Sequence, residues 1–204
     1  MASAVVAAMV LTFLLPDGFG FGLFWVFPVI EGALLVALIV ADPGRIDRRQ
    51  SQLRWLSIGL VAVLAFGALW ATAQLISDLI NGGPETNSGG DLLQAGAVVW
   101  VSNNIAFALL YWELDGGGAA QRAHQMRARP ELAFPQQLNP NLGWSDWRPR
   151  FIDYLYLGFT NATAFSPTDV MPLVPWAKIM MTVQSLISLT ILGLVIARAV
   201  NVLT

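Results

Sequence analysis

Polar side chains gather between two hydrophobic segments in the last quarter of the sequence, and their oxygens could bind water or ions. Within ten residues the chain carries hydroxyl, amide and carboxylate groups, on Thr160, Asn161, Thr163, Ser166, Thr168 and Asp169. Such groups are costly between apolar segments unless they meet water, an ion or one another. We expect a functional polar site here, and the alternative is the purely structural closure of a loop.

Three more polar residues lie inside hydrophobic segments. Glu31 lies in one of them, where a charged residue costs roughly 2.5–3.5 kcal/mol. It is either an ion or proton site or a structural partner of Arg198 or Asn103. Asn103 and Asn104 lie in the middle of another segment. We expect these amides to join helices, because side-chain amides hydrogen-bond across transmembrane helix contacts.

A stripe with helical spacing follows in the last hydrophobic segment. Its members recur every three or four positions, so one face of a helix would present Gln184, Ser188, Ile191, Val195 and Arg198. A weakly polar face of this kind can line a pore, and small polar residues equally help transmembrane helices to pack. The spacing leaves both interpretations open, and Arg198 alone is also explained by a side chain that extends to the interface.

The composition indicates an integral membrane protein. Of the 204 residues, 56% are hydrophobic and 12% are charged, whereas soluble domains carry about 25% charged residues. The net charge of −2 gives no basic field for nucleic acid. Membrane lipids are therefore the expected surroundings.

Residue counts exclude several kinds of chemistry. The chain has no cysteine, which excludes disulfides, thiol catalysis, iron–sulfur clusters and the usual structural zinc sites. A single histidine, His124, leaves no histidine cluster for a metal or haem. Glu113 and Asp115 form a carboxylate pair without a third catalytic group. We therefore expect neither an enzyme nor a cofactor or metal.

The hydrophobic segments predict an all-α fold with one membrane domain. A spanning helix needs about 20 residues, and four segments reach this length, near 20–41, 55–80, 92–114 and 175–203. Residues 1–15 predict a short N-terminal helix. The chain then divides into N-terminal transmembrane helices within 1–114, an extramembrane linker, 115–150, and a C-terminal part, 151–204.

The C-terminal part has an unusual order of segments. A hydrophobic stretch near 151–163 is too short to span a bilayer, a polar turn follows it, and a full-length hydrophobic segment comes last. This order predicts a re-entrant half-helix and loop. Such backbone occurs at membrane depth only where protein surrounds it or where it lines a water-filled cavity.

This order resembles the pore module of the potassium-channel superfamily, which consists of a pore helix, a filter and an inner helix. Asp169-Val-Met-Pro172 and Trp176-Ala177-Lys178 fall at the family's offsets after the filter. Tyr156 lies 13 positions before Asp169, where the family often has a tryptophan that bonds the filter aspartate. The ungapped match to the filter, residues 164–168, contains no glycine and includes Pro167.

The resemblance implies a homo-oligomer, a tetramer in the family, around a central pore for monovalent cations. It implies support of the pore helix by Tyr156, Thr160 and Asn161. It also implies a filter-like constriction formed by Thr163, Ala164, Phe165, Ser166, Pro167, Thr168 and Asp169. Without glycine the ordered carbonyl rings of a potassium filter are difficult to form, so we expect weak cation selectivity.

Other functions are open at this point. The segment is also similar to uncharacterised bacterial membrane proteins, which implies a multi-pass protein of the bacterial inner membrane. A non-conducting scaffold or binding module with a pore-loop fold is one alternative to a channel. A small secondary transporter is another, because Glu31 and a broken helix would suit coupled transport.

Two lines of evidence disagree about membrane orientation. Segment 42–54 contains four arginines and segment 115–150 contains five, whereas segment 81–91 contains neither lysine nor arginine. Basic residues in short loops mark the cytoplasmic side, so the charges place both basic segments inside. In the channel family the loop before the pore helix is external. The sequence therefore leaves the orientation open.

Overall fold

A computed structural model gives the fold of most of the chain. It describes residues 2–14, 29–30, 32–33, 36, 51–82, 89–118, 121–122, 130–139, 141, 147–164 and 169–203. Three helices in this part of the chain are long and apolar enough to cross a membrane: α3 (Ser51–Asn81), α4 (Gly89–Leu114) and α8 (Pro175–Leu203). The chain is therefore a helical transmembrane protein.

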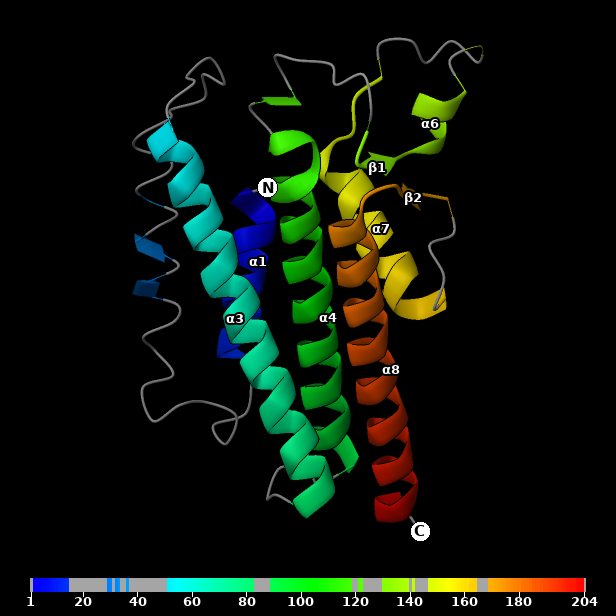
Figure 1. Ribbon diagram of the computed structural model, residues 1–204. Coiled ribbons are helices and arrows are strands. Elements are labelled where there is room, and N and C mark those ends of the chain that lie inside the picture. Colours follow the sequence, from blue (N-terminus) through cyan, green and yellow to red (C-terminus); the bar gives the residue numbers. More distant parts are fainter. Residues whose placement is uncertain are drawn as a thin grey trace.

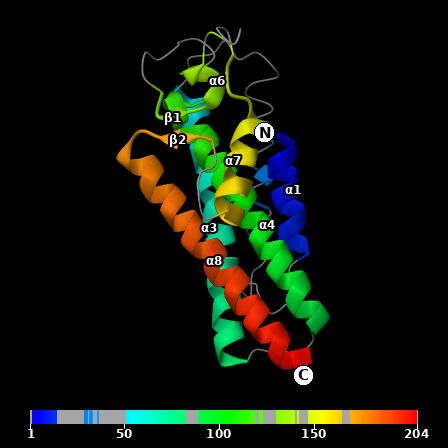
Figure 2. The same cartoon turned by 90° about the vertical axis from the view of Figure 1, so that its right-hand side faces the viewer.

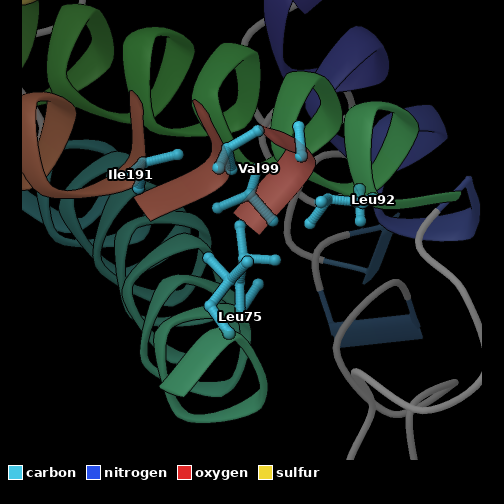
Figure 3. Close-up of a cluster of buried hydrophobic side chains, with 9 residues drawn as sticks. Leu75, Leu92, Val99 and Ile191 are labelled. Carbon is cyan, nitrogen blue, oxygen red and sulfur yellow. The ribbon is translucent and has the colours of Figure 1, made fainter. Parts of the chain in front are cut away.

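The three long helices form an up-and-down bundle with α4 in contact with every other described helix of more than ten residues. Figure 1 shows that α3 begins at the upper end of the bundle, α4 returns to that end, and α8 descends from it. In the lower half, nine buried apolar side chains from all three helices pack together, among them Leu75, Leu92, Val99 and Ile191 (Figure 3). The fit is close, because a Cβ on Gly96 would lie 2.9 Å from Val195.

A short helix, α1 (Ala2–Phe13), lies beside the upper half of the bundle (Figure 1). Its 12 residues extend about 18 Å at the usual rise of a helix, less than the roughly 30 Å of a bilayer core. Ala4, Val5 and Ala8 pack against residues of α3 and α4. The predicted short N-terminal helix is thus confirmed.

Helix α7 (Phe151–Ala164) is only half as long as its neighbours. It begins at the upper end of the bundle and ends part of the way down, in both views (Figure 2). The chain is at the upper end again at β2 (Met171–Pro172), and α8 starts from there. The chain therefore enters and leaves the α7 region at the same end, as the predicted half-helix near 151–163 required.

Segments from the linker form a cap over this end of the bundle. We define the cap as the 3₁₀ turn η3 (Asp115–Gly117), β1 (Leu132–Ala133), α6 (Pro135–Leu138) and β2. Strands β1 and β2 are antiparallel, with Leu132 opposite Pro172 and Ala133 opposite Met171. The cap thus joins the linker to the residues that follow α7, a pairing that the sequence did not predict.

The predicted spans are confirmed in part. Helices α3, α4 and α8 correspond to the segments expected near 55–80, 92–114 and 175–203. The segment expected at 20–41 lies largely outside the described residues. Three spanning helices are therefore shown where four were expected.

Candidate functional site

The amide of Gln184 joins the half-helix to two long helices. This side chain is 1% exposed. Its Nε2 donates to the carbonyl oxygen of Gly158 in α7 at 2.9 Å. Its Oε1 accepts from the Tyr111 hydroxyl of α4 at 2.8 Å and from Nδ2 of Asn161 in α7 at 2.8 Å. Both acceptor lone pairs of this amide are used, so Gln184 connects α4, α7 and α8 at one point.

Asn161 completes this network at the C-terminal end of α7. Its Nδ2 also donates to the carbonyl oxygen of Met181 at 2.9 Å. The hydroxyl of Ser185 donates to the carbonyl oxygen and to Oδ1 of Asn161, at 3.1 and 3.2 Å. The last four carbonyls of a helix have no partner within it, and α8 supplies one here. We call Tyr111, Gly158, Asn161, Gln184 and Ser185 the amide network.

Gly158 allows α7 to approach α4 closely. A Cβ at this position would lie 3.2 Å from the backbone oxygen of Asn104 and 3.5 Å from Nε2 of Gln184. Any side chain would therefore push α7 away from α4 and disturb the amide network. The glycine and the network together determine where the end of α7 lies.

The opposite face of α7 is largely exposed, although the ring of Phe159 packs edge-on against Trp100 of α4, with the ring centres 5.8 Å apart. Residues at helical spacing on this face are exposed: Ile152, Tyr156, Phe159 and Thr163. The Thr163 hydroxyl donates to the carbonyl oxygen of Phe159 at 2.9 Å. Of the polar residues predicted for the site, Thr160 and Asn161 therefore face the interior of the chain, while Tyr156 and Thr163 face outward.

The filter-like segment is described only at its two ends. Ala164 is the last residue of α7, and Asp169 is exposed. The predicted site residues Phe165, Ser166, Pro167 and Thr168 lie outside the described residues, as does Glu31.

The resemblance predicts that Asp169 accepts a hydrogen bond from Tyr156 or from a backbone N–H, and no such bond joins the described side chains of Tyr156 and Asp169. Tyr156 is 53% exposed. The tyrosine of α7 that bonds a carboxylate is Tyr154, whose hydroxyl donates to Oδ2 of Asp115 at 2.5 Å. The two tyrosines are two positions apart, which places them on different faces of the helix.

The stripe on α8 packs inside the chain. Gln184, Ser188, Ile191 and Val195 are all buried, and the last two belong to the apolar cluster with α3 and α4. The pore-lining interpretation of this stripe therefore does not hold within a single chain, because α4 and α3 cover it. Arg198 lies at the lower end, with Nη2 3.7 Å from where a Cβ on Gly82 would be. A cation beside the C-terminal end of α3 interacts favourably with the helix dipole.

Asn103 joins two spanning helices, as predicted. Its Nδ2 donates to the hydroxyl of Thr72 in α3 at 2.5 Å and to the carbonyl oxygen of Val99 at 3.1 Å. Asn104 donates within its own helix, to the carbonyl oxygen of Trp100 at 2.9 Å. The Oδ1 atoms of both asparagines are buried without a hydrogen-bond partner among the described residues. Of these two asparagines, only Asn103 therefore links two helices through its side chain.

Asp115 holds the cap onto α7. Its side chain is 4% exposed, and besides the Tyr154 hydroxyl it accepts from the backbone N–H of Leu132 at 3.3 Å. Burial raises the pKa of the Tyr154 phenol, so this hydroxyl stays protonated and donates. Asp115 therefore connects the end of α4 to β1 and to α7.

Arg122 closes the C-terminal end of α4. Its Nη1 donates to the carbonyl oxygens of Trp112 and Asp115 at 2.6 and 2.5 Å. Its guanidinium carbon lies 4.4 Å from the centre of the Trp112 ring and 5.1 Å from that of Tyr154. The neighbouring carboxylate of Glu113 accepts from the Ser57 hydroxyl of α3 at 2.5 Å. The two carboxylates noted in the sequence thus have separate structural partners.

Sequence reasoning missed Tyr111, Tyr154, Gly158, Ser185 and Arg122. Tyr111 and its partner Gln184 are 73 positions apart in the sequence. One signal was present, because Gly158 and Asn161 are three positions apart and share a helix face. Small and amide residues on one face are typical of a close contact between membrane helices.

The described residues do not gather three or more histidine, aspartate or glutamate side chains in a position to hold a metal ion. No family model, curated protein or solved structure matches this chain.

Proposed function

We propose that this chain is an ion-channel-like membrane protein, weakly selective for cations, in which α7 and the turn after it form the constriction. The observation that carries the proposal is that α7 ends part of the way along the bundle. The C-terminal end of a helix carries a partial negative charge of about half a unit. At membrane depth this charge favours a cation, and half-helix C-termini coordinate cations in transporters.

The amide network supports this role because it holds the end of α7 in place. Gln184 and Asn161 direct their polar atoms to other protein groups, so they serve as supports rather than as ion ligands. The ligands in the proposal are side-chain oxygens, from Thr163 and from Ser166 and Thr168 in the turn. Side-chain hydroxyls do not form the stacked carbonyl rings of a potassium filter, and we therefore propose weak discrimination between potassium and sodium.

The proposal includes a homo-oligomer in the bacterial inner membrane. The outward face of α7, with Tyr156, Phe159 and Thr163, would then face the central axis or another copy. A tetramer rests on the resemblance to potassium channels. Monovalent cations and lipids are the partners, and no cofactor or catalytic reaction is involved.

Cation flux into liposomes tests the proposal. Purified wild-type protein reconstituted into liposomes is expected to carry potassium and sodium at similar rates. If the wild-type protein carries neither ion, the Phe165→Ala variant, which lacks a bulky ring, is expected to carry both. Thr163→Ala should change the ratio of the two rates. The matched control is Thr190→Ala in the middle of α8. It removes an exposed hydroxyl that, like that of Thr163, bonds within its own helix. A reversal potential near the potassium equilibrium value would contradict weak selectivity.

A second candidate function is a non-conducting membrane module that binds a partner. The observation that favours it is the burial of the α8 stripe inside the chain, which leaves apolar residues such as Ile179, Leu186 and Ile196 on the exposed face of α8. Absence of flux through both the wild-type protein and Phe165→Ala would favour this candidate. A purified particle in which Thr163 lies away from any symmetry axis would favour it as well.

A further inference from the structure

The basic segments of the sequence join the same end of the bundle. Helix α3 begins, α4 ends, and α7 and α8 both begin at the capped end (Figure 1). Segment 42–54 leads into α3, and segment 115–150 connects α4 to α7. The nine arginines of these two segments are therefore joined in sequence to the capped end. The segment from α3 to α4 connects at the opposite end, and it contains neither lysine nor arginine.

The described side chains show the same asymmetry. Arg148, Arg150 and Lys178 are exposed where α7 and α8 begin, and Arg122 donates a hydrogen bond to Asp115 of the cap. At the opposite end the described residues include one basic side chain, Arg198. Several tryptophans also lie at or near helix ends on the capped side: Trp55, Trp112, Trp147 and Trp176. Tryptophans of this kind are typical of the membrane interface.

We propose that the cap lies on the cytoplasmic side of the membrane. Helix α7 and the residues that lead from it to β2, which we call the α7 hairpin, then enter the bilayer from the cytoplasm. Lysine and arginine bias orientation when they lie in loops shorter than about 60 residues and near the ends of spanning helices. Both basic segments satisfy these conditions. Anionic lipids of the cytoplasmic leaflet attract such residues, which makes their phosphate groups the partners of the exposed basic side chains.

This orientation is opposite to the one that the resemblance to potassium channels implies, in which the hairpin enters from outside. The linker, the start of α8 and the start of α3 all lie at the same end of the bundle (Figure 1). Both basic segments must therefore be on the same side of the membrane as the entry point of α7. Reversing the molecule would place nine arginines and Lys178 outside. The inference does not depend on the proposed function, since it concerns the placement of the cap whether or not the protein conducts.

Cysteine labelling in intact cells tests the orientation, and the chain has no native cysteine to interfere. Leu138→Cys places a thiol on the exposed side of the cap, and Asn81→Cys places one at the opposite end of the bundle. With a membrane-impermeant maleimide, Asn81→Cys is expected to react in intact cells. Leu138→Cys is expected to react only after the membrane is opened, with at least a tenfold difference in labelling.

Labelling of both variants in opened membranes shows that each thiol is accessible, and Asn139→Cys replaces Leu138→Cys if the first does not react. Reaction of the cap thiol in intact cells would overturn the inference. Equal labelling of both ends in intact cells would also overturn it, because the protein would then insert in both directions. Ion flux in liposomes does not depend on which end of the protein faces the cytoplasm. A failure of the proposed orientation is therefore distinguishable from a failure of the proposed function.

Discussion

The two halves of the bundle share apolar packing and differ in the hydrogen bonds that are added to it. In the lower half, nine apolar residues of α3, α4 and α8 pack against one another. In the upper half, a second apolar cluster includes Phe107, Leu157 and Met181, and the amide network and Asp115 add directional hydrogen bonds between α4, α7, α8 and the cap. A spanning helix satisfies its own backbone and needs only a complementary surface. A half-helix ends inside the bundle, and directional bonds can hold that end where apolar packing alone would allow it to slide.

The largest effect is expected from Gln184→Leu, which removes the centre of the amide network but keeps an apolar side chain of similar size. The Tyr111 hydroxyl loses its partner, Nδ2 of Asn161 keeps only the carbonyl oxygen of Met181, and the Gly158 carbonyl loses its side-chain donor. Each buried unsatisfied group costs about 1–3 kcal/mol, and relaxation reduces the total, so we expect a loss of roughly 3 kcal/mol in the free energy of unfolding. Denaturant titration in detergent micelles measures it.

The matched control is Gln94→Leu in the lower half of α4. Gln94 is exposed, and its replacement is expected to change the free energy of unfolding by less than about 0.5 kcal/mol. Equal losses for the two variants would show that the amide network does not hold the half-helix.

An intermediate effect is expected at the cap. Asp115→Asn and Tyr154→Phe each remove part of the same hydrogen bond. Hydrogen bonds between neutral groups contribute about 0.5–1.5 kcal/mol, and hydrogen bonds to charged groups about 1.5–3 kcal/mol. We therefore expect a double-mutant cycle to give a coupling of about 1.5 kcal/mol. The free energies of unfolding of the four proteins provide the measurement.

The comparison cycle uses Asp169→Asn and Tyr156→Phe, the pair to which the resemblance points. Both side chains are exposed, and we expect their effects on stability to add. Coupling in this cycle, together with additivity in the Asp115 cycle, would mean that the half-helix is rotated relative to the arrangement described above.

The smallest effects are expected at two helical glycines. Gly158→Ala brings a methyl group to 3.2 Å from the backbone oxygen of Asn104, and we expect a loss of about 1 kcal/mol because backbone cannot easily move away. Gly59→Ala meets nothing within 4 Å, and removing a flexible glycine from a helix should stabilise it by up to about 1 kcal/mol. Thermal unfolding in micelles measures both, and a stabilised Gly158→Ala would contradict the close contact.

The helices could be predicted because length and hydropathy act locally. Residues 151–163 were too short to span and 175–203 were long enough, and the bounds of α7 and α8 agree with these limits. The same reasoning holds for Asn103, which bonds Thr72 of a neighbouring helix, but not for Asn104, which bonds within its own helix.

The partners within the site could not be predicted, because they depend on how distant segments pack. A polar stripe on α8 has the same spacing whether it lines a pore or contacts α4, so spacing alone could not decide. The offset from Asp169 pointed to Tyr156, whereas the carboxylate bonded by α7 is Asp115. Asp115 lies 39 positions before Tyr154, and neither residue carries a local signal of the contact.

The pairing of β1 with β2 has a consequence for the order of events during synthesis. Leu132 pairs with Pro172 and Ala133 with Met171, so the ribosome completes β1 long before it reaches the partner strand. Strand β1 therefore cannot pair with β2 until α7 and the residues between α7 and β2 have been synthesised. Pairing of β1 with β2 therefore requires that the 37 residues between Ala133 and Met171 have been synthesised and that the chain has returned to the capped end.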